Sequence, residues 1–162
     1  EWQCSTLQLD FNIPDRFELD YIGEDNKPHT PIMLHRVVYG SLERFIGILL
    51  EHTNGNLPTW LSPIQVRVIN YSEKNEGSVQ EFTKELQSKG VRADYDTSPR
   101  TVNYKIREAE LQKIPYIIVI GDKEEKSNTI AVRRKGSRKP EYGVKKEEFI
   151  KTLIEEIKER KL

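Results

Sequence analysis

The feature that most constrains the fold is a near-continuous apolar run, Pro115-Tyr116-Ile117-Ile118-Val119-Ile120. A run of this kind, without polar residues at alternate positions, is typical of a strand that is buried on both faces. Strand-like and helical segments alternate on both sides of it, from about residue 64 to the end of the chain. This alternation predicts a layered α/β domain with a largely parallel mixed sheet of about five strands.

The expected elements of this α/β domain follow from apolar periodicity and from helix-end signals. The expected strands cover residues 64–69, 91–95, 115–120 and 129–134, and a loop covers 97–102. The first helix runs from the capping box Ser78-Val79-Gln80-Glu81 to Gly90, and the second covers 103–113 with Ile106, Ala109 and Leu111 facing inward. The final helix is amphipathic and contains Phe149, Ile150, Leu153, Ile154 and Ile157.

A segment rich in Gly and Pro, residues 54–63, separates this domain from a different pattern before it. We therefore expect two domains, 1–57 and 58–162. In the first, Trp2 to Phe11 alternates loosely as a strand does, a turn surrounds Pro14, residues 17–22 form a short extended run, and residues 23–28 form a polar turn.

The first domain ends in a strand, a sharp turn and a helix. Residues 31–38 supply the apolar, partly β-branched side chains of a strand, Gly40 permits the turn, and Ser41 can cap the helix that follows. Leucine, phenylalanine and isoleucine then recur at helical spacing up to Leu50, which predicts one broad buried face. Arg44 stands at the positive helix start, where it either helps to form an anion site or extends into solvent as a surface arginine.

Composition limits the classes of partner and compartment. The 26 basic residues balance 26 acidic residues, so any binding of nucleic acid requires a local basic patch. The single Cys4 cannot form an internal disulfide and fits a reducing compartment. No run approaches the roughly 20 apolar residues of a membrane span, and the N-terminus is not a signal peptide. We expect no membrane partner and a cytoplasmic location.

Several segments together resemble one known family. The segment from His35-Arg36 to Gly40-Ser41-Leu42-Glu43-Arg44-Phe45 and on to Glu51 resembles motif 3 of the class II aminoacyl-tRNA synthetases. Glu1 to Phe11, Tyr21 to Asp25, Asn103 to Glu108 and Gly121 to Glu124 resemble the threonyl-tRNA synthetases in particular. The resemblance implies a partial class II antiparallel sheet with the motif 3 strand and helix, followed by an anticodon-binding domain. It also implies that the chain is the C-terminal part of a longer enzyme. We therefore expect residues 58–162 to form the stable unit and the apolar face of the motif 3 helix to be exposed in this chain.

The resemblance implies roles for residues of the first domain. Arg44 matches the catalytic motif 3 arginine that contacts the ATP phosphates, and Gln3 and Thr6 match positions near the adenosine. Gln8 and Ser41 match positions of the threonine pocket. Without the family, these would be polar residues on an exposed strand face and a capping serine.

His35 matches one ligand of the catalytic Zn2+. A lone histidine at a strand end is otherwise most often structural. The family's other two zinc ligands are implied to lie before Glu1, so we expect this chain alone to bind zinc weakly or not at all. The parent enzyme would use ATP with Mg2+. The isolated chain is expected to be inactive because motifs 1 and 2 are absent.

The second domain carries five positive charges in the seven residues from Arg133 to Lys139. A run of this kind is either a solvated loop or, close to Tyr104, Lys105 and Arg107, a surface that binds phosphates and stacks bases. The resemblance implies that Arg107, Glu124 and Arg133 read anticodon bases. Pro99 and Thr101 stand where many bacterial relatives have Asn and Lys, so those two contacts are not carried over.

Two functional hypotheses follow. The first is the C-terminal portion of a threonine–tRNA ligase, which would activate threonine with ATP, transfer it to tRNA(Thr) and act as a homodimer in full length. The second is a non-catalytic tRNA-binding or accessory module of the same fold. The presence of His35, Ser41 and Arg44 favours the first, because a pure binding module has no use for them.

Overall fold

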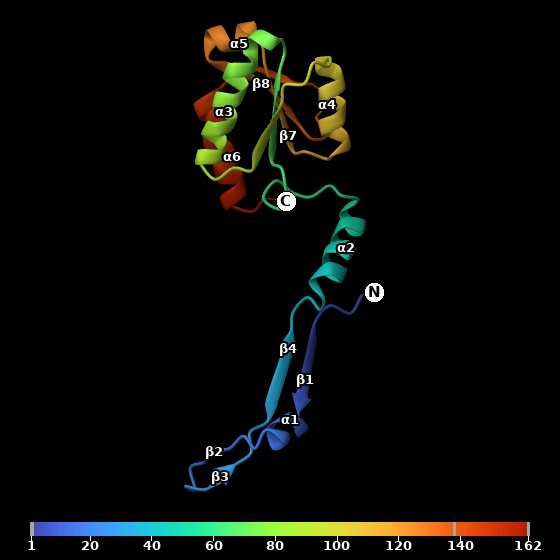
Figure 1. Cartoon of the computed structure of the whole chain (residues 1–162), viewed down its shortest axis with the longest axis vertical. Helices are drawn as coiled ribbons and strands as arrows, with labels where there is room; N and C mark the ends of the chain where they lie inside the picture. The colour runs from blue at the N-terminus through green and yellow to red at the C-terminus, as the bar shows by residue number, and fades with distance from the viewer. Residues whose placement is uncertain (1, 138, 162) are drawn as a thin grey trace. The chain divides into compact units, whose positions relative to one another are not determined.

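The computed structural model describes residues 2–137 and 139–161, and it divides into two compact units (Figure 1). The hairpin unit is Glu1–Gly55 and the sheet domain is Asn56–Leu162. Glu1, and Arg138 within the basic run 133–139, lie outside the described residues. The boundary expected between residues 57 and 58, as the limit between two functional domains, stays a prediction.

The sheet domain is built on one five-stranded mixed sheet in the order β6-β5-β7-β8-β9. Its strands are β5 Val66–Asn70, β6 Ala93–Asp96, β7 Tyr116–Ile120, β8 Thr129–Arg134 and β9 Glu141–Lys145. β5 pairs in parallel with β6 and β7, whereas β8 runs antiparallel to both β7 and β9. The strand order therefore reverses at β5, which has β6 on one side and β7 on the other.

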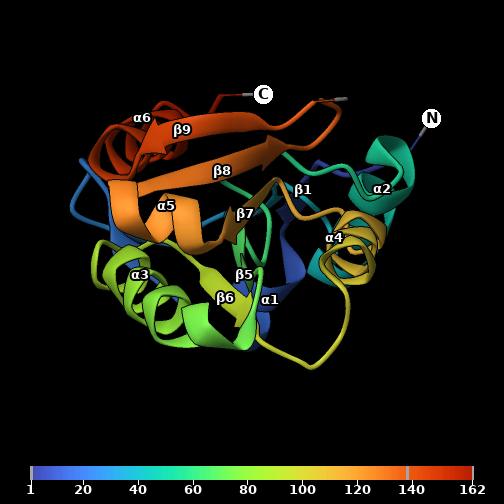
Figure 2. The same ribbon diagram turned by 90° about the horizontal axis from the view of Figure 1, so that it is seen from above.

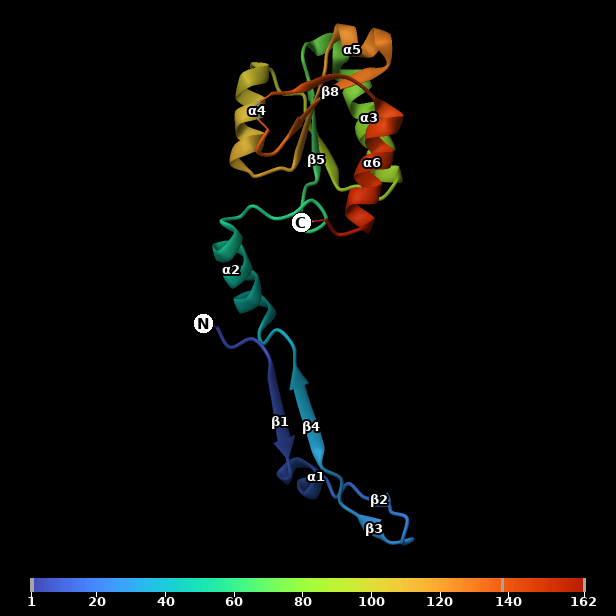
Figure 3. The same cartoon turned by 180° about the vertical axis from the view of Figure 1, so that it is seen from behind.

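Helices cover both faces of the sheet. Helices α3 (Glu76–Ser88) and α6 (Lys146–Lys158) lie on one face and α4 (Val102–Leu111) lies on the other (Figures 1 and 3). Alternate residues of β7 belong to different cores, since Ile118 packs with α3 and α6 and Ile117 packs with α4. The apolar run that predicted a strand buried on both faces is therefore confirmed.

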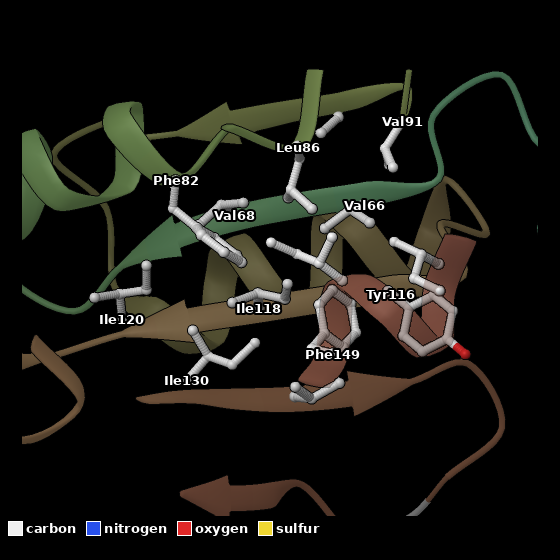
Figure 4. Close-up of a cluster of buried hydrophobic side chains, with 14 of the residues drawn as sticks. Val66, Val68, Phe82, Leu86, Val91, Tyr116, Ile118, Ile120, Ile130 and Phe149 are labelled. Carbon is white, nitrogen blue, oxygen red and sulfur yellow. The ribbon is translucent and has the colours of Figure 1, made fainter. Parts of the chain in front are cut away.

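The larger core lies under α3 and α6. Figure 4 shows the α3 side chains Phe82 and Leu86 directed onto β5, and both are almost completely buried. Phe149 of α6 meets the ring of Tyr116 edge-on, with 5.5 Å between the ring centroids. The helix expected before Gly90 is thus confirmed as α3, and its buried face includes Val79, Phe82 and Leu86.

Three expectations for the sheet domain were incomplete or wrong. The capping box at Ser78 is wrong, because α3 begins at Glu76 after a short 3-10 helix, Glu73–Asn75, and Ser78 instead donates to Glu125 of α5. Leu111 was expected to face inward and is 64% exposed, because α4 ends there. Helix α5 (Asp122–Ser127), which lies against β8 and β7 (Figure 2), and strand β9 were not located in advance.

The hairpin unit is organised by the antiparallel pair β1 (Thr6–Asp10) and β4 (Met33–Val37). The connection between them contains α1 (Asn12–Arg16) and a smaller pair, β2 (Tyr21–Ile22) and β3 (Pro28–His29), joined by the expected polar turn. Helix α2 (Leu42–Thr53) follows β4.

One expectation for the hairpin unit is wrong, and another depends on what surrounds helix α2. The turn expected around Pro14 is a short helix, which proline tolerates in its first turn, and the Asp10 carboxylate accepts from the backbone N–H groups of Asn12 and Ile13 at its start. The apolar face of α2, which periodicity alone predicted to be buried, is exposed as expected for this chain: Leu42 is 62% exposed and Ile46 is 52% exposed. Among the described residues, no helix has the length and hydropathy that crossing a membrane requires.

Candidate nucleotide and RNA sites

The β1–β4 register brings three residues of the first candidate site to one face. Gln8 stands opposite His35 and Thr6 opposite Val37. Directly opposed residues of an antiparallel pair point to the same face, and every second residue of a strand shares that face. Thr6, Gln8 and His35 therefore lie together on one side of the hairpin, as a common site requires.

The start of α2 holds the other two residues of this site. Ser41 caps the helix, its hydroxyl oxygen accepting from the Arg44 backbone N–H at 3.2 Å, as expected. The Arg44 guanidinium turns back and donates from Nη2 to the backbone oxygen of Gln3 at 2.9 Å. Gly40 has φ of +73°, and a Cβ there would lie 2.9 Å from Arg44 Nη2. The glycine therefore provides both the turn and the space that the guanidinium occupies.

His35 has a carboxylate partner. Its Nε2 lies 3.1 Å from Asp10 Oδ2. Hydrogen bonds from the backbone N–H groups of Ile13 and Asn12, and then the contact with His35, lower the pKa of Asp10 below its usual value. A histidine held by a carboxylate through one ring nitrogen can present the other to a metal.

The described residues offer His35 as one candidate zinc ligand and do not by themselves make a zinc site. Within residues 2–137 and 139–161, no group of three or more His, Cys, Asp or Glu side chains is placed to hold a metal. His35 with Asp10 is an oriented single ligand, and a structural or catalytic zinc needs at least three protein ligands.

The second candidate site is a cavity of about 480 Å³ in the sheet domain. It opens where β5 and β7 end, next to the point at which the strand order reverses, and such crevices are the usual ligand sites of open α/β sheets. Residues from α4, α5, β8 and β9 complete its wall, and the lining consists of Tyr71, Val102, Asn103, Ile106, Val119, Gly121, Asp122, Lys123, Glu124, Ala131, Arg133, Pro140 and Tyr142.

The cavity unites two of the three residues expected to read bases. The Glu124 carboxylate accepts from the Gly121 backbone N–H at 3.2 Å, and Arg133 Nη1 lies 4.0 Å from Glu110 Oε1. Arg107 is exposed on α4, one turn after the lining residue Asn103, and does not itself line the cavity. A carboxylate acceptor and a guanidinium donor therefore share one cavity, with a second guanidinium on the adjoining helix.

The start of the basic run is tied into the fold. Arg134 pairs with the buried Glu156 at 3.4 Å, and Lys135 donates to the backbone oxygen of Leu57 at 2.7 Å. Burial, and then the nearby Lys113, lower the pKa of Lys135. The run is thus not a plain solvated loop, because Arg133, Arg134 and Lys135 each have a defined contact.

Two residues near α4 have structural roles. Lys105, considered above as part of a basic surface, is only 2% exposed and donates to Asn70 Oδ1 at 2.5 Å, so it is unavailable to phosphate. Burial lowers its pKa. Thr101 caps α4, accepting from the Tyr104 backbone N–H at 3.3 Å. Sequence reasoning gave no attention to two exposed aromatic residues of the cavity, Tyr71 and Tyr142.

Comparison with known proteins assigns the two parts of the chain to known domain families. Residues 1–53 match the tRNA synthetase class II core domain (G, H, P, S and T), and residues 65–156 match the anticodon binding domain. The chain is 50% identical to a threonine–tRNA ligase of Carboxydothermus hydrogenoformans over 99% of its length, and 49% identical to one of Thermotoga petrophila over 100%. It spans about a quarter of the length of these relatives, 25% in each case.

A solved structure supports the same assignment. The RNA binding domain of threonyl-tRNA synthetase from Cryptosporidium parvum is 36% identical to the chain and has a TM-score of 0.84. That match covers 95% of this chain and 39% of the other. The chain therefore belongs to the threonyl-tRNA synthetase family, of which it contains a class II core segment followed by an anticodon binding domain.

Proposed function

We propose that the chain is the part of a threonine–tRNA ligase that recognises the anticodon of tRNA(Thr) and supplies motif 3 to the catalytic site. The observation that carries the first half is the placing of Glu124 and Arg133 in one cavity at the ends of β5 and β7. Reading unpaired bases requires hydrogen-bond donors and acceptors together, whereas cations alone would only follow phosphates.

Arg107 belongs to the same proposal. It lies one turn from Asn103 on α4, and its side chain is exposed. Glu110, which lies 4.0 Å from Arg133, is three residues after Arg107, so the two arginines flank one stretch of the helix. If one anticodon base occupied the cavity, the next base or phosphate of the loop would contact Arg107.

The second half of the proposal concerns motif 3. Arg44 would bind the ATP phosphates and stabilise the charge that develops as pyrophosphate leaves. Its guanidinium is already oriented by the Gln3 backbone oxygen, 2.9 Å from Nη2, so the residues proposed for adenosine and phosphate are physically connected. Gln3 and Thr6 would hold the adenosine of ATP, and Mg2+ would accompany the phosphates.

Threonine would be held from the same face of the hairpin. Gln8 and Ser41 would supply its polar contacts, and His35 would be one zinc ligand. The hydroxyl oxygen of Ser41 uses one of its two acceptor positions for the helix cap and keeps one. A bound zinc would recognise the amino and hydroxyl groups of threonine. A site built for that hydroxyl rejects an analogue lacking it. We further propose a homodimer acting in the cytoplasm for the full-length enzyme.

The test is binding of this chain to a tRNA(Thr) anticodon stem-loop across a salt series. The control RNA has the two bases shared by all threonine anticodons replaced. We expect preference for the authentic loop. Arg133→Ala should reduce that preference by roughly tenfold, because losing one base-edge contact of an arginine costs about 1–3 kcal/mol.

Lys151→Ala is the matched protein control. It also removes one positive charge, but from the exposed side of α6, on the opposite face of the sheet from the cavity. It should leave the preference unchanged. Equal binding of both loops by the unmodified chain, lost steeply with added salt, would show only a general basic surface and would contradict the proposal.

A further inference from the structure

Two tyrosines line the same cavity as Glu124 and Arg133 and are mostly exposed. Tyr71 directly follows β5 and is 69% exposed, and Tyr142 lies in β9 and is 73% exposed. Neither side chain belongs to one of the two hydrophobic cores. A large aromatic side chain that does not fill a core stabilises the domain little, so both are available for a ligand.

Tyr71 is held in place beside Glu124. Its backbone N–H donates to the Ile120 oxygen at 2.9 Å, one step beyond the β5–β7 ladder. A Cβ added to Gly121 would lie 3.2 Å from Tyr71 Cβ and 3.0 Å from Glu124 Oε2. Gly121 has an ordinary extended backbone, with φ of −121°, so space rather than conformation explains the glycine. The Cβ of Tyr71 and the Glu124 carboxylate thus both lie close to Gly121, on the side where a Cβ would stand.

Tyr142 reaches the cavity from β9, which is an edge strand of the sheet. The β8–β9 pairing shifts register between Ile130 and Val132, and Gly143 has φ of +70°. These features produce a local irregularity in β9 at Tyr142. Because Tyr71 follows β5 and Tyr142 belongs to β9, the two rings are contributed by strands that are separated by β7 and β8.

We propose that Tyr71 and Tyr142 are stacking surfaces for unpaired bases of the anticodon loop, whose edges Glu124 and Arg133 read. This inference rests on the proposed function and names two further binding residues for it. Flat aromatic rings are the usual partners of splayed-out RNA bases, because every base has a π face. The cavity volume of about 480 Å³ is in the range of pockets that enclose small organic groups.

The first experiment measures affinity for the tRNA(Thr) anticodon stem-loop by fluorescence anisotropy. Tyr71→Ala and Tyr142→Ala should each weaken binding by about 5- to 150-fold, the equivalent of one lost base–aromatic stack. Each Phe variant should stay within about twofold of wild type, because the ring keeps its π face. Leu variants, which keep apolar bulk without a flat ring, should resemble the Ala variants.

A salt series and a control tyrosine separate stacking from other effects. The slope of log affinity against log salt should be unchanged in the Ala variants, because no phosphate-neutralising cation is removed. Tyr95→Ala changes a tyrosine that is 48% exposed on β6 and does not line the cavity, so it should bind as wild type does. Thermal unfolding by circular dichroism verifies that each variant is folded.

A direct spectroscopic readout completes the test. 2-Aminopurine placed singly at each anticodon position should change its emission on binding at one or more positions, and Tyr71→Ala or Tyr142→Ala should remove that change. If wild type distinguishes the authentic from the replaced loop while both Ala variants bind equally well, the stacking proposal is overturned and the proposed function stands. Leu variants that match the Phe variants would also overturn it. If wild type does not distinguish the loops, the proposed function itself fails.

Discussion

At the residue scale, the most demanding group in the sheet domain is the buried carboxylate of Glu156. It is 7% exposed and accepts from the Thr59 hydroxyl at 2.5 Å and the Tyr116 hydroxyl at 2.6 Å, with Arg134 at 3.4 Å. A buried charge without such partners is strongly unfavourable. Glu156 therefore connects α6, the central strand β7 and the segment that leads into the domain.

Tyr116→Phe should destabilise the sheet domain by about 1.5–3 kcal/mol, because it removes one hydrogen bond to a buried charged group. Urea unfolding followed by circular dichroism measures this difference. Tyr95→Phe serves as the control, since that tyrosine is half-exposed on β6. Equal losses in the two variants would show that the Glu156 contact contributes no more than an ordinary surface hydroxyl.

The difference in unfolding free energy between wild type and Tyr116→Phe should depend on pH. Burial, and then the hydrogen bond with Glu156, raise the pKa of Tyr116 above its ordinary value. The unfolded chain therefore loses this proton at a lower pH than the folded one, and the stabilisation present below about pH 10 declines as the pH rises further. The unfolding free energies of wild type and Tyr116→Phe should accordingly converge in alkaline buffer. A gap that widens with pH would contradict this assignment.

Which single residues can be predicted from sequence depends on how local their surroundings are. Ser41 was expected to cap a helix because its partner is three residues away. The burial of Lys105 could not be foreseen, because its acceptor Asn70 is 35 residues distant and is brought close only by the sheet. Tyr71 and Tyr142 escaped notice for the same reason, since neither stands in a motif and only the fold places them in one cavity.

At the element scale, α4 positions the candidate RNA site. It supplies Asn103 and Ile106 to the cavity wall and carries Arg107. Its N-terminus depends on Thr101, whose hydroxyl accepts from the Tyr104 backbone N–H. Thr101 stands where many bacterial relatives were expected to have a base-contacting lysine, and here it has a helix-capping role.

Thr101→Ala should cost about 1 kcal/mol of stability, the usual value of a lost N-cap. Thr101→Ser keeps the capping oxygen and should restore most of the loss, which urea unfolding can verify. Affinity for the anticodon stem-loop should fall less than it does for Arg133→Ala, because Thr101 acts through the helix. A Thr101→Ala protein with wild-type stability but strongly reduced RNA binding would instead indicate direct contact with RNA.

Elements rich in apolar residues were predicted well, and mainly polar ones were not. The buried residues of β7 and of the α3 face form local apolar patterns that can be read directly from a short stretch of sequence. Helix α5 is six residues of mainly charged sequence without a buried residue, and β9 contains Gly143 and has no buried position. Their existence depends on pairing with β8 and packing on the sheet, which are long-range effects. Helix α1 was taken for a turn because Pro14 is also compatible with one.

At the scale of the whole molecule, the two units differ in how they bury apolar groups. The sheet domain has two cores, one on each face of its sheet. The hairpin unit leaves large apolar side chains of β1, β4 and α2 exposed, including Leu7, Leu34 and Leu42 at 63%, 55% and 62%. Many exposed large apolar side chains in one small unit are typical of a surface that another protein surface covers. Alternation of strands and helices predicted the sheet domain from sequence. The exposure of apolar side chains in the hairpin unit depends on what else packs against it, and no sequence pattern identifies that surface.

This difference predicts independent folding of the sheet domain. A protein of residues 56–162 should unfold cooperatively, with the same urea midpoint as the sheet domain in the whole chain, because both cores lie within it. It should remain monodisperse in analytical ultracentrifugation and bind little 8-anilinonaphthalene-1-sulfonate. The whole chain should bind more of this dye and self-associate, and replacing Leu42 and Ile46 on α2 by Gln should reduce both effects. If instead residues 56–162 were less stable than the whole chain, or equally prone to associate, the exposed face of the hairpin unit would not be the source, and the two units would have to stabilise each other.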